Sequence, residues 1–212
     1  ANLVANGLVD GGSGALNAVS SNFTTLDGLF NAPFAGDVAV FMGAPGTVTV
    51  AAAQDFEGFQ FVTDGYQFTG ADLVAVGDSA LNTAASFLNA DADTNTVIDT
   101  VISGTAGIDK LGSGTVQLTR ANTFTGATTV VGGQLVLSGD GALASESIGV
   151  TSGTLSTDGG AFAASASVTI DAPGTLTVSG DETLAALTND GRTDICTSAT
   201  LSAGIIDNLE TG

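Results

Sequence analysis

The chain has 212 residues, of which 22 are acidic and three are basic, so its formal charge at pH 7 is −19. Three basic residues cannot form the cationic face that nucleic acids and anionic membranes require. The sequence contains no histidine, which excludes Ser-His-Asp and Cys-His catalysis and histidine-ligated metals. The mean hydropathy of +0.39 also argues against a disordered chain.

The first half of the chain is less regular than the second. Residues 1–45 are rich in Asn, Gly and Ser, and we expect an irregular N-terminal cap or lead-in there. Strand patterns follow at 46–50, 56–61 and 66–68. Nine of the eleven phenylalanines and the only tyrosine lie before residue 90, which predicts a wider or more irregular core in this half. The segment 80–89 (ALNTAASFLN) is expected to form a short helix within a loop.

The second half contains a repeat of about 20 residues. Its copies start at residues 114, 133, 153, 174 and, in a weaker form, 199. An aliphatic residue stands two positions after the start, mostly with a second one four positions after it, as in a strand with one buried face. A second short strand precedes most copies, separated from them by a Gly or Pro turn.

Such a unit cannot bury its own inner face, but stacked parallel units can share one continuous core. We therefore predict an all-β fold, a right-handed parallel β-helix (β-solenoid), with coils over 46–212 after the cap at 1–45. The sequence shows no linker, so a single continuous domain is expected. The side chains predicted to line up inside it are Val116, Leu118, Leu135, Leu137, Leu155, Leu176 and Val178.

The stretch 107–139, GIDKLGSGTVQLTRANTFTGATTVVGGQLVLSG, resembles the passenger-associated transport repeat of bacterial autotransporters. This sequence differs from the family pattern at two positions, where Val116 replaces a leucine and Phe124 replaces a tyrosine. The segments 39–50 and 59–70 also look like parts of large autotransporter passengers. The matching residues are Lys110, Gly112, Ser113, Gly114, Val116, Leu118, Asn122, Thr123, Phe124, Gly126, Thr128, Gly133 and Leu135.

This resemblance implies an autotransporter (type V secretion) passenger segment, located on the cell surface or secreted by a Gram-negative bacterium. Such passengers are commonly adhesins or self-association factors, so we expect a non-enzymatic rod that contacts host or bacterial surface molecules, protein or glycan, or further copies of itself. The parent chain is expected to be anchored by a C-terminal outer-membrane β-barrel outside this sequence. Because the sequence begins at Ala1 without Met, we expect a processed product or an excised segment. The alternatives are a passive spacer that promotes folding and, with less support, a β-helix enzyme acting on polysaccharide.

No catalytic residue, cofactor or established metal site is expected. The run Gly77-Asp78-Ser79-Ala80 resembles a serine nucleophile motif, but without histidine we expect a polar turn. Arg120 is the one candidate for the cationic base of a polysaccharide lyase, with Asp140 as its nearest carboxylate. An exposed ion pair between Arg120 and an aspartate is the favoured alternative. Cys196 cannot form an intrachain disulfide, and we expect it to be a buried thiol in a strand.

Four oxygen-bearing residues occupy the first, third, fifth and ninth positions of a calcium-binding loop: Asp91, Asp93, Asn95 and Asp99. Thr96 replaces the glycine of the sixth position and Ile102 the glutamate of the twelfth, so the loop is incomplete as an EF-hand. A solvated acidic turn is favoured, and a weak calcium site is the alternative. Asn122 and Asn189 are expected to support coil turns.

Overall fold

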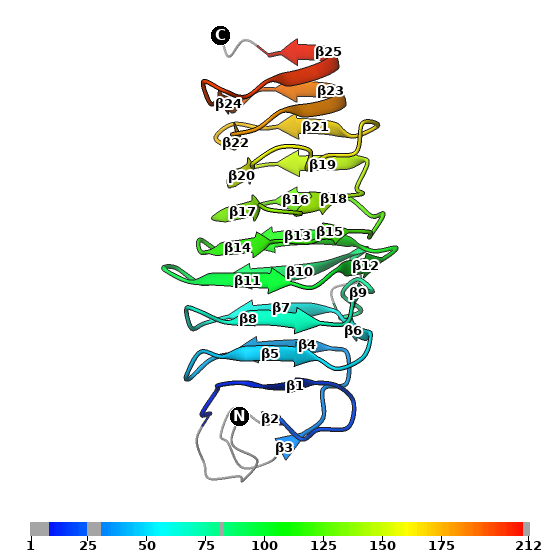
Figure 1. Cartoon of the computed structure of the whole chain (residues 1–212), viewed down its shortest axis with the longest axis vertical. Helices are drawn as coiled ribbons and strands as arrows, with labels where there is room; N and C mark the ends of the chain where they lie inside the picture. Colours follow the sequence, from blue (N-terminus) through cyan, green and yellow to red (C-terminus); the bar gives the residue numbers. More distant parts are fainter. Residues whose placement is uncertain (1–8, 25–30, 81–82, 210–212) are drawn as a thin grey trace.

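The computed structural model describes residues 9–24, 31–80 and 83–209, in which every regular element is a strand. The strands stack into a rod in chain order, with β1 to β3 at one end and β25 at the other (Figure 1). Within these ranges no helix is long and apolar enough to cross a membrane.

Two parallel sheets of nine strands each form the long faces of the rod. Sheet 1 consists of β1 (Gly14–Leu16), β5 (Thr47–Val50), β8 (Gln67–Gly70), β11 (Asn95–Asp99), β14 (Thr115–Leu118), β17 (Gln134–Leu137), β20 (Thr154–Thr157), β22 (Thr175–Val178) and β24 (Arg192–Ile195). Sheet 2 consists of β4 (Val38–Phe41), β7 (Gly58–Phe61), β10 (Ala85–Ala90), β13 (Gly107–Leu111), β16 (Thr128–Val130), β19 (Ser147–Val150), β21 (Ser167–Ile170), β23 (Glu182–Asn189) and β25 (Leu201–Asn208).

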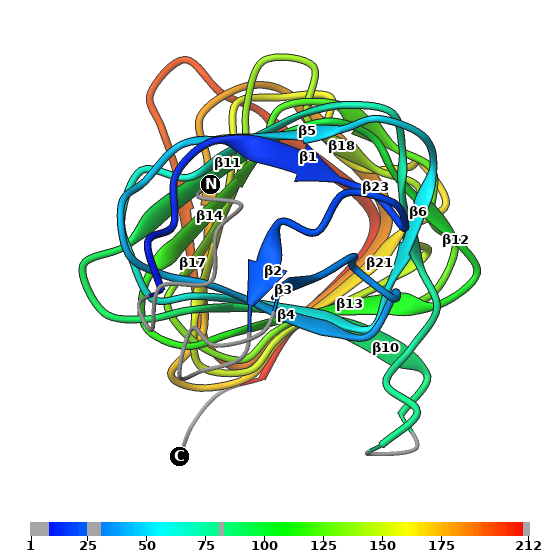
Figure 2. The ribbon, with the colours of Figure 1, turned by 90° about the horizontal axis from the view of Figure 1, so that it is seen from below.

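A third face is only partly formed. It contains a three-stranded parallel sheet of β6 (Gln54–Phe56), β9 (Leu73–Ala75) and β12 (Ile102–Gly104), and a parallel pair of β15 (Ala121–Asn122) and β18 (Ala142–Leu143). At the N-terminal end, β2 (Phe23–Thr24) and β3 (Asn31–Ala32) form an antiparallel pair. Seen from that end, the chain passes from β11 through β12 to β13 clockwise as it recedes (Figure 2), so the helix is right-handed. The predicted right-handed parallel β-helix is confirmed.

The predicted aliphatic core is also confirmed. Along sheet 1, Val116 pairs with Leu135, which pairs with Leu155, and Leu155 pairs with Leu176. A neighbouring ladder runs from Leu118 through Leu137 and Thr157 to Val178. All of these side chains are buried, so each coil covers the apolar face of the previous one.

Aromatic rings fill the core of the first coils, as the uneven distribution of phenylalanine predicts. Phe59 stacks on Phe56 with ring centroids 4.6 Å apart and on Phe68 at 5.4 Å. Phe41 meets Phe68 edge to face at 5.0 Å and Tyr66 at 5.5 Å. Both long sheets include strands from before and after residue 45, because β1 pairs with β5 and β4 pairs with β7. The division of the chain at 45 stays a prediction.

The expected helix over 80–89 is wrong in the part that the structure describes, which leaves out residues 81 and 82. Residues 85–90 form β10 between β7 and β13, and every second side chain is buried: Ser86, Leu88 and Ala90. Phe87 lies on the outer surface over Gly58, in the space that a Cβ of Gly58 would occupy. Pairing with two neighbouring strands overrides the local helix propensity of this segment.

Lys110 of the transport-repeat-like segment lies inside the core. It stands in register with Leu88 of one coil and Val130 of the next, and it is fully buried. Its ammonium group donates hydrogen bonds to the carbonyl oxygens of Leu111 (2.7 Å), Gly112 (3.2 Å) and Gly132 (3.1 Å). Burial lowers the pKa of Lys110 to about 8. The lysine therefore ties the corner of its own coil to the corner of the next.

A buried carboxylate fixes a loop near the C-terminal end. Glu182, at the start of β23, is 2% exposed. Both of its oxygens accept hydrogen bonds from the backbone N–H of Ala161 at 3.1 Å, and Oε2 also accepts from the N–H of Phe162 at 3.3 Å. The hydroxyl of Thr157 donates to the same carboxylate. The carboxylate thus compensates for its burial by holding the loop after β20.

Replacing Glu182 with glutamine should lower the free energy of unfolding by about 1–3 kcal/mol, because the amide NH2 cannot accept the hydrogen bonds of the buried donors. Urea unfolding followed by far-UV circular dichroism measures the loss. Glu146→Gln is the matched control, since the Glu146 carboxylate accepts one exposed hydrogen bond, from Ser165 at 3.0 Å. The control should change stability by less than about 0.5 kcal/mol. Equal losses in the two variants would contradict a special role for Glu182.

Candidate functional site

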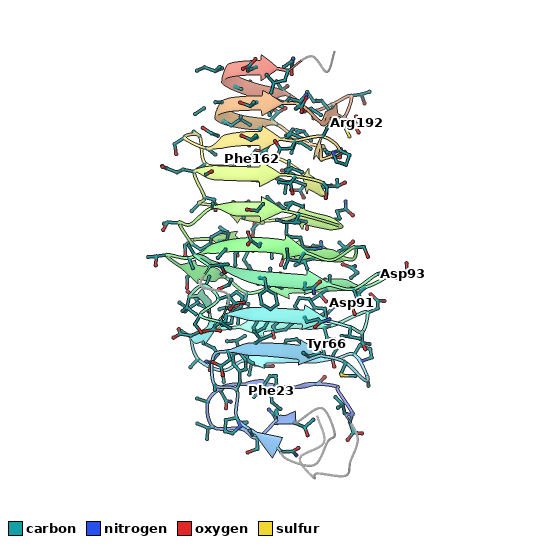
Figure 3. The ribbon with its side chains drawn as sticks, turned by 180° about the vertical axis from the view of Figure 1, so that it is seen from behind. Phe23, Tyr66, Asp91, Asp93, Phe162 and Arg192 are labelled. Carbon is teal, nitrogen blue, oxygen red and sulfur yellow. The ribbon has the colours of Figure 1, made fainter. Side chains whose placement is uncertain are left out.

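The structure places the four residues of the incomplete calcium loop at two separate places. Asp91 and Asp93 lie in the turn between β10 and β11, with Asp93 in a left-handed conformation (φ 61°), and Asn95 begins β11. Figure 3 shows Asp93 at the edge of the rod, pointing away from it. Asp99 ends the same strand, about 13 Å farther along at 3.3 Å per residue.

Asp99 has other partners. Its Oδ1 accepts hydrogen bonds from Thr119 Oγ1 and Arg120 Nε, both at 2.7 Å, and these bonds lower the pKa of the carboxyl group. No group of three or more acidic, histidine or cysteine side chains within the described residues is placed to hold a metal ion. A calcium site formed by all four residues is therefore not assembled, and calcium binding by the turn alone stays a prediction.

Arg120 forms the exposed ion pair that the sequence favours. Its Nε and Nη2 donate to the two oxygens of Asp99 at 2.7 and 3.4 Å, and both side chains are about half exposed. Asp140 lies beside it along a shallow hollow between successive coils. Because the guanidinium group is engaged by Asp99, it is poorly placed to act as a cationic base.

The serine-nucleophile-like run is a polar turn. Asp78 and Thr83 exchange backbone hydrogen bonds at 3.2 and 3.0 Å as an antiparallel bridge, and the described residues around it project from the side of the rod (Figure 2). Ser79 is exposed in this turn. The described geometry thus agrees with the expected turn at Ser79.

The expectation for Cys196 is wrong, because its thiol is exposed and lies just after β24. In the part of the chain that the structure describes, β24 is the last strand of sheet 1, so no further coil packs over residue 196.

Asn122 does support a coil turn. Its Oδ1 accepts from the N–H of Ile102 (2.9 Å), and its Nδ2 donates to the carbonyls of Arg120 (2.8 Å) and Ala142 (3.0 Å). Asn189, at the end of β23, donates more weakly to Asn208 (3.4 Å).

The outer surface of sheet 1 carries an uncharged array that we call the hydroxyl face. It spans four successive coils, about 4.8 Å apart, and consists of Thr115, Gln117, Gln134, Val136, Thr154, Ser156, Thr175 and Thr177. Gln134 Nε2 donates to Ser156 Oγ on the next coil at 2.9 Å, which fixes part of the array. Ion pairs flank it at both ends, Arg120–Asp99 and Arg192–Asp194. The repeat in the sequence predicts which strands form this face. Only the register between the strands shows that uncharged side chains lie next to one another over four coils.

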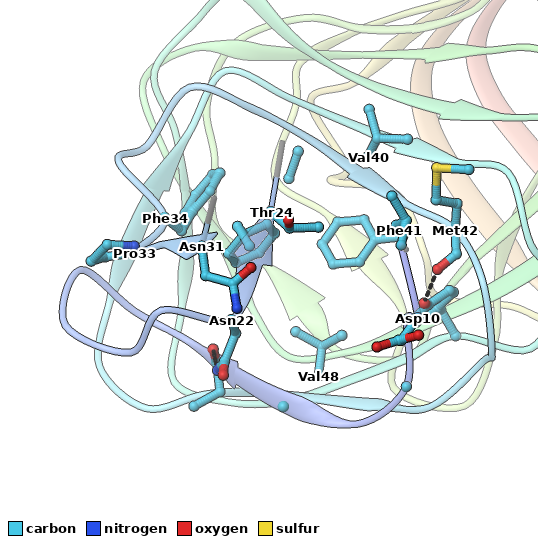
Figure 4. Close-up of a pocket in the computed structure, with 18 of the residues that line it drawn as sticks. Asp10, Asn22, Thr24, Asn31, Pro33, Phe34, Val40, Phe41, Met42 and Val48 are labelled. Atoms are coloured by element: carbon cyan, nitrogen blue, oxygen red, sulfur yellow. Dashed lines mark hydrogen bonds between the residues drawn. The ribbon is translucent and has the colours of Figure 1, made fainter. Parts of the chain in front are cut away.

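A hollow of about 380 Å³ opens at the N-terminal end of the rod. Figure 4 shows the rings of Phe34 and Phe41 and the side chain of Val48 around it, with Asn22 and Asn31 on one side and Asp10 on the other. Sequence reasoning missed this hollow, because its lining residues, which come from β1 to β5, the segments beside them and Tyr66, are brought together only by the coiling of the chain.

Comparison with known proteins gives a relative in Brucella suis biovar 1 (strain 1330). The chain is 37% identical over 197 residues to a protein named adhesin BmaC autotransporter, and the match covers 84% of this chain. The chain spans 6% of the length of that protein. No family model and no solved structure matches the chain. The resemblance of 107–139 to a transport repeat therefore stays a prediction.

Proposed function

Because the chain belongs to the autotransporter passengers, which lie on the surface of Gram-negative bacteria or are secreted, we propose that it is a non-enzymatic adhesive segment that binds through the hydroxyl face. The named relative is an adhesin. The observation that carries the proposal is a neutral, regular array on a rod whose net charge is −19.

The chemistry of the face limits its partner. Hydroxyl and amide groups donate and accept hydrogen bonds, whereas the three basic residues of the chain cannot attract an anionic polymer. The partner is therefore a neutral glycan or an uncharged polar stretch of a surface protein. Single contacts of this kind are weak, but many equivalent contacts along a rigid rod add up through multivalency.

Self-association is the second candidate. Two rods of charge −19 repel each other, and the hydroxyl face is a neutral surface on which two copies can approach. Such clustering requires salt or divalent cations to screen the remaining charge. A passive spacer role is the alternative to both candidates.

Introducing one negative charge into the hydroxyl face tests the proposal. Thr154→Glu should reduce binding of the purified rod to cultured host cells or extracellular matrix by about tenfold, since an unpaired carboxylate must be desolvated in the contact. Thr169→Glu is the matched control, because Thr169 is an exposed residue of β21 in sheet 2 and the change in net charge is the same. The control should bind within about twofold of the unchanged rod.

Three outcomes separate the candidates. Loss in Thr154→Glu alone supports adhesion through the hydroxyl face. If the unchanged rod clusters at high salt and Thr154→Glu does not, as measured by sedimentation, while cell binding is the same for both, the result supports self-association. No binding by the unchanged rod, or equal loss in both variants, contradicts the proposal and leaves the spacer role.

A further inference from the structure

Successive coils of the hydroxyl face repeat the same outward positions in register. Thr115 pairs with Gln134, and Gln134 pairs with Thr154. Thr154 pairs in turn with Thr175. In each of these strands the alternate side chains are buried, so the four residues form an outer column with one residue per coil. The step along this column is the distance between neighbouring strands, about 4.8 Å.

The hydroxyl groups of this column are available to a partner. Those of Thr115, Thr154 and Thr175 make no hydrogen bond to any described residue, and their side chains are half-buried. The amide of Gln134 is fixed between them by its bond to Ser156 at 2.9 Å. Because a hydroxyl group both donates and accepts, the column matches a partner whose own hydroxyl groups recur at the same step.

The step between coils distinguishes the two kinds of partner that the chemistry of the face allows. A glycan in extended β-1,4 linkage advances by about 5 Å per sugar, against about 4.8 Å per coil, so the mismatch over three steps is about 1 Å or less. An extended polypeptide advances by about 3.3 Å per residue, and its side chains on one side lie about 6.6 Å apart. Neither peptide distance equals the step along the rod. A peptide matches only the spacing within one strand, where a coil offers two outward residues, such as Thr154 and Ser156.

We propose that the hydroxyl face binds a neutral, extended β-1,4-linked glycan that lies along the rod axis, with one sugar over each of four coils. This inference rests on the proposed adhesive function of the same face and names its partner. The threonine hydroxyls exchange hydrogen bonds with the sugar hydroxyls, and Val136 in the neighbouring column contacts the apolar C–H groups of a ring. A neutral chain also avoids the repulsion that a rod of charge −19 exerts on acidic glycans.

Two glucose oligomers of equal composition and different shape test the proposal. Cellotetraose is β-1,4-linked and extended, whereas maltotetraose is α-1,4-linked and curved, so only cellotetraose can meet four coils at once. Titrations followed by NMR of the threonine methyl groups measure each dissociation constant and locate the contact. Cellotetraose should bind about fivefold more tightly than maltotetraose. It should also bind about tenfold more tightly than cellobiose, which reaches only two coils and makes fewer hydrogen bonds.

Variants test the direction of the glycan on the rod. Thr115→Val and Thr175→Val each remove one hydroxyl and keep a β-branched side chain, at positions three coils and about 14 Å apart. Each should weaken cellotetraose binding by about 3–5-fold, because a chain along the axis reaches both positions. A chain that lies across single coils would lose only the sites at the changed coil, so neither variant would reach threefold. Thr169→Val makes the same change on sheet 2 and should leave the affinity unchanged.

Equal binding of cellotetraose and maltotetraose, or weaker binding in only one of the two threonine variants, would overturn the axial match. Absence of saturable binding to either glycan would overturn the glycan as partner. The adhesive function is judged separately by the cell-binding experiment on Thr154. If Thr154→Glu reduces cell binding although neither glycan binds, the hydroxyl face remains adhesive toward a protein partner, whereas absence of both cell and glycan binding contradicts both proposals.

Discussion

Gly114→Ala is expected to destabilise the rod by about 3 kcal/mol or more, at the upper end of what overpacking costs. Gly114 is the first residue of a repeat copy and stands at the corner between sheet 2 and sheet 1. A Cβ there would overlap the carbonyl oxygen of Asp91 and the hydroxyl of Thr94 on the preceding coil. Its φ lies outside the left-handed region, so the requirement for glycine is the close approach of two coils.

Gly149→Ala is the matched control. Gly149 lies within β19, its φ is also outside the left-handed region, and the nearest atom to an added Cβ is a methyl carbon of Thr129 at 3.8 Å. This variant should be neutral or more stable by up to about 1 kcal/mol, because alanine loses less backbone entropy on folding than glycine. Urea unfolding of both variants measures the difference, and similar stabilities would show that the coil corner can relax.

The second large effect is a rise of stability at alkaline pH caused by Lys110. The folded rod releases the proton of Lys110 above pH 8, where its lowered pKa lies, whereas the unfolded chain keeps it up to about pH 10.4. Between these values the unfolded state binds more protons, so the free energy of unfolding increases with pH. We expect a gain of about 1.5 kcal/mol between pH 8 and pH 9.5, because the slope rises from about half of 1.4 kcal/mol per pH unit at the folded-state pKa toward the full value.

Lys110→Met removes the titrating group while keeping an unbranched side chain in the core. The unfolding free energy of this variant should lack the gain between pH 8 and pH 9.5. The difference between the two pH profiles therefore gives the contribution of Lys110. The range ends at pH 9.5 because burial also raises the pKa of Tyr66, which lowers stability as the pH rises above the ordinary tyrosine value near 10. Parallel pH profiles of the two proteins would show that Lys110 is not titrated from a buried position.

The repeat was sufficient to predict the coils, because a buried side chain of one coil needs an apolar side chain at the same place in the next. The ladder Val116–Leu135–Leu155–Leu176 follows directly from the spacing of the repeat. The segment 80–89 has no such repeat, and its local composition favoured a helix although two neighbouring strands hold it extended. Cys196 was assigned to a buried strand because the local pattern does not show that β24 ends at Ile195, one residue before the exposed thiol.

The sequence by itself determined the parallel β-helix and its apolar core, since the period acts on every coil alike, and its resemblance to a known family indicated the class of surface protein. Only the tertiary structure decided where the exceptions lie: a lysine ammonium bonded to three carbonyls inside the core, a carboxylate buried at Glu182, and an aromatic hollow at the N-terminal end. These features depend on which residues of different coils meet, and that contact is set by register and coiling rather than by the neighbours along the chain.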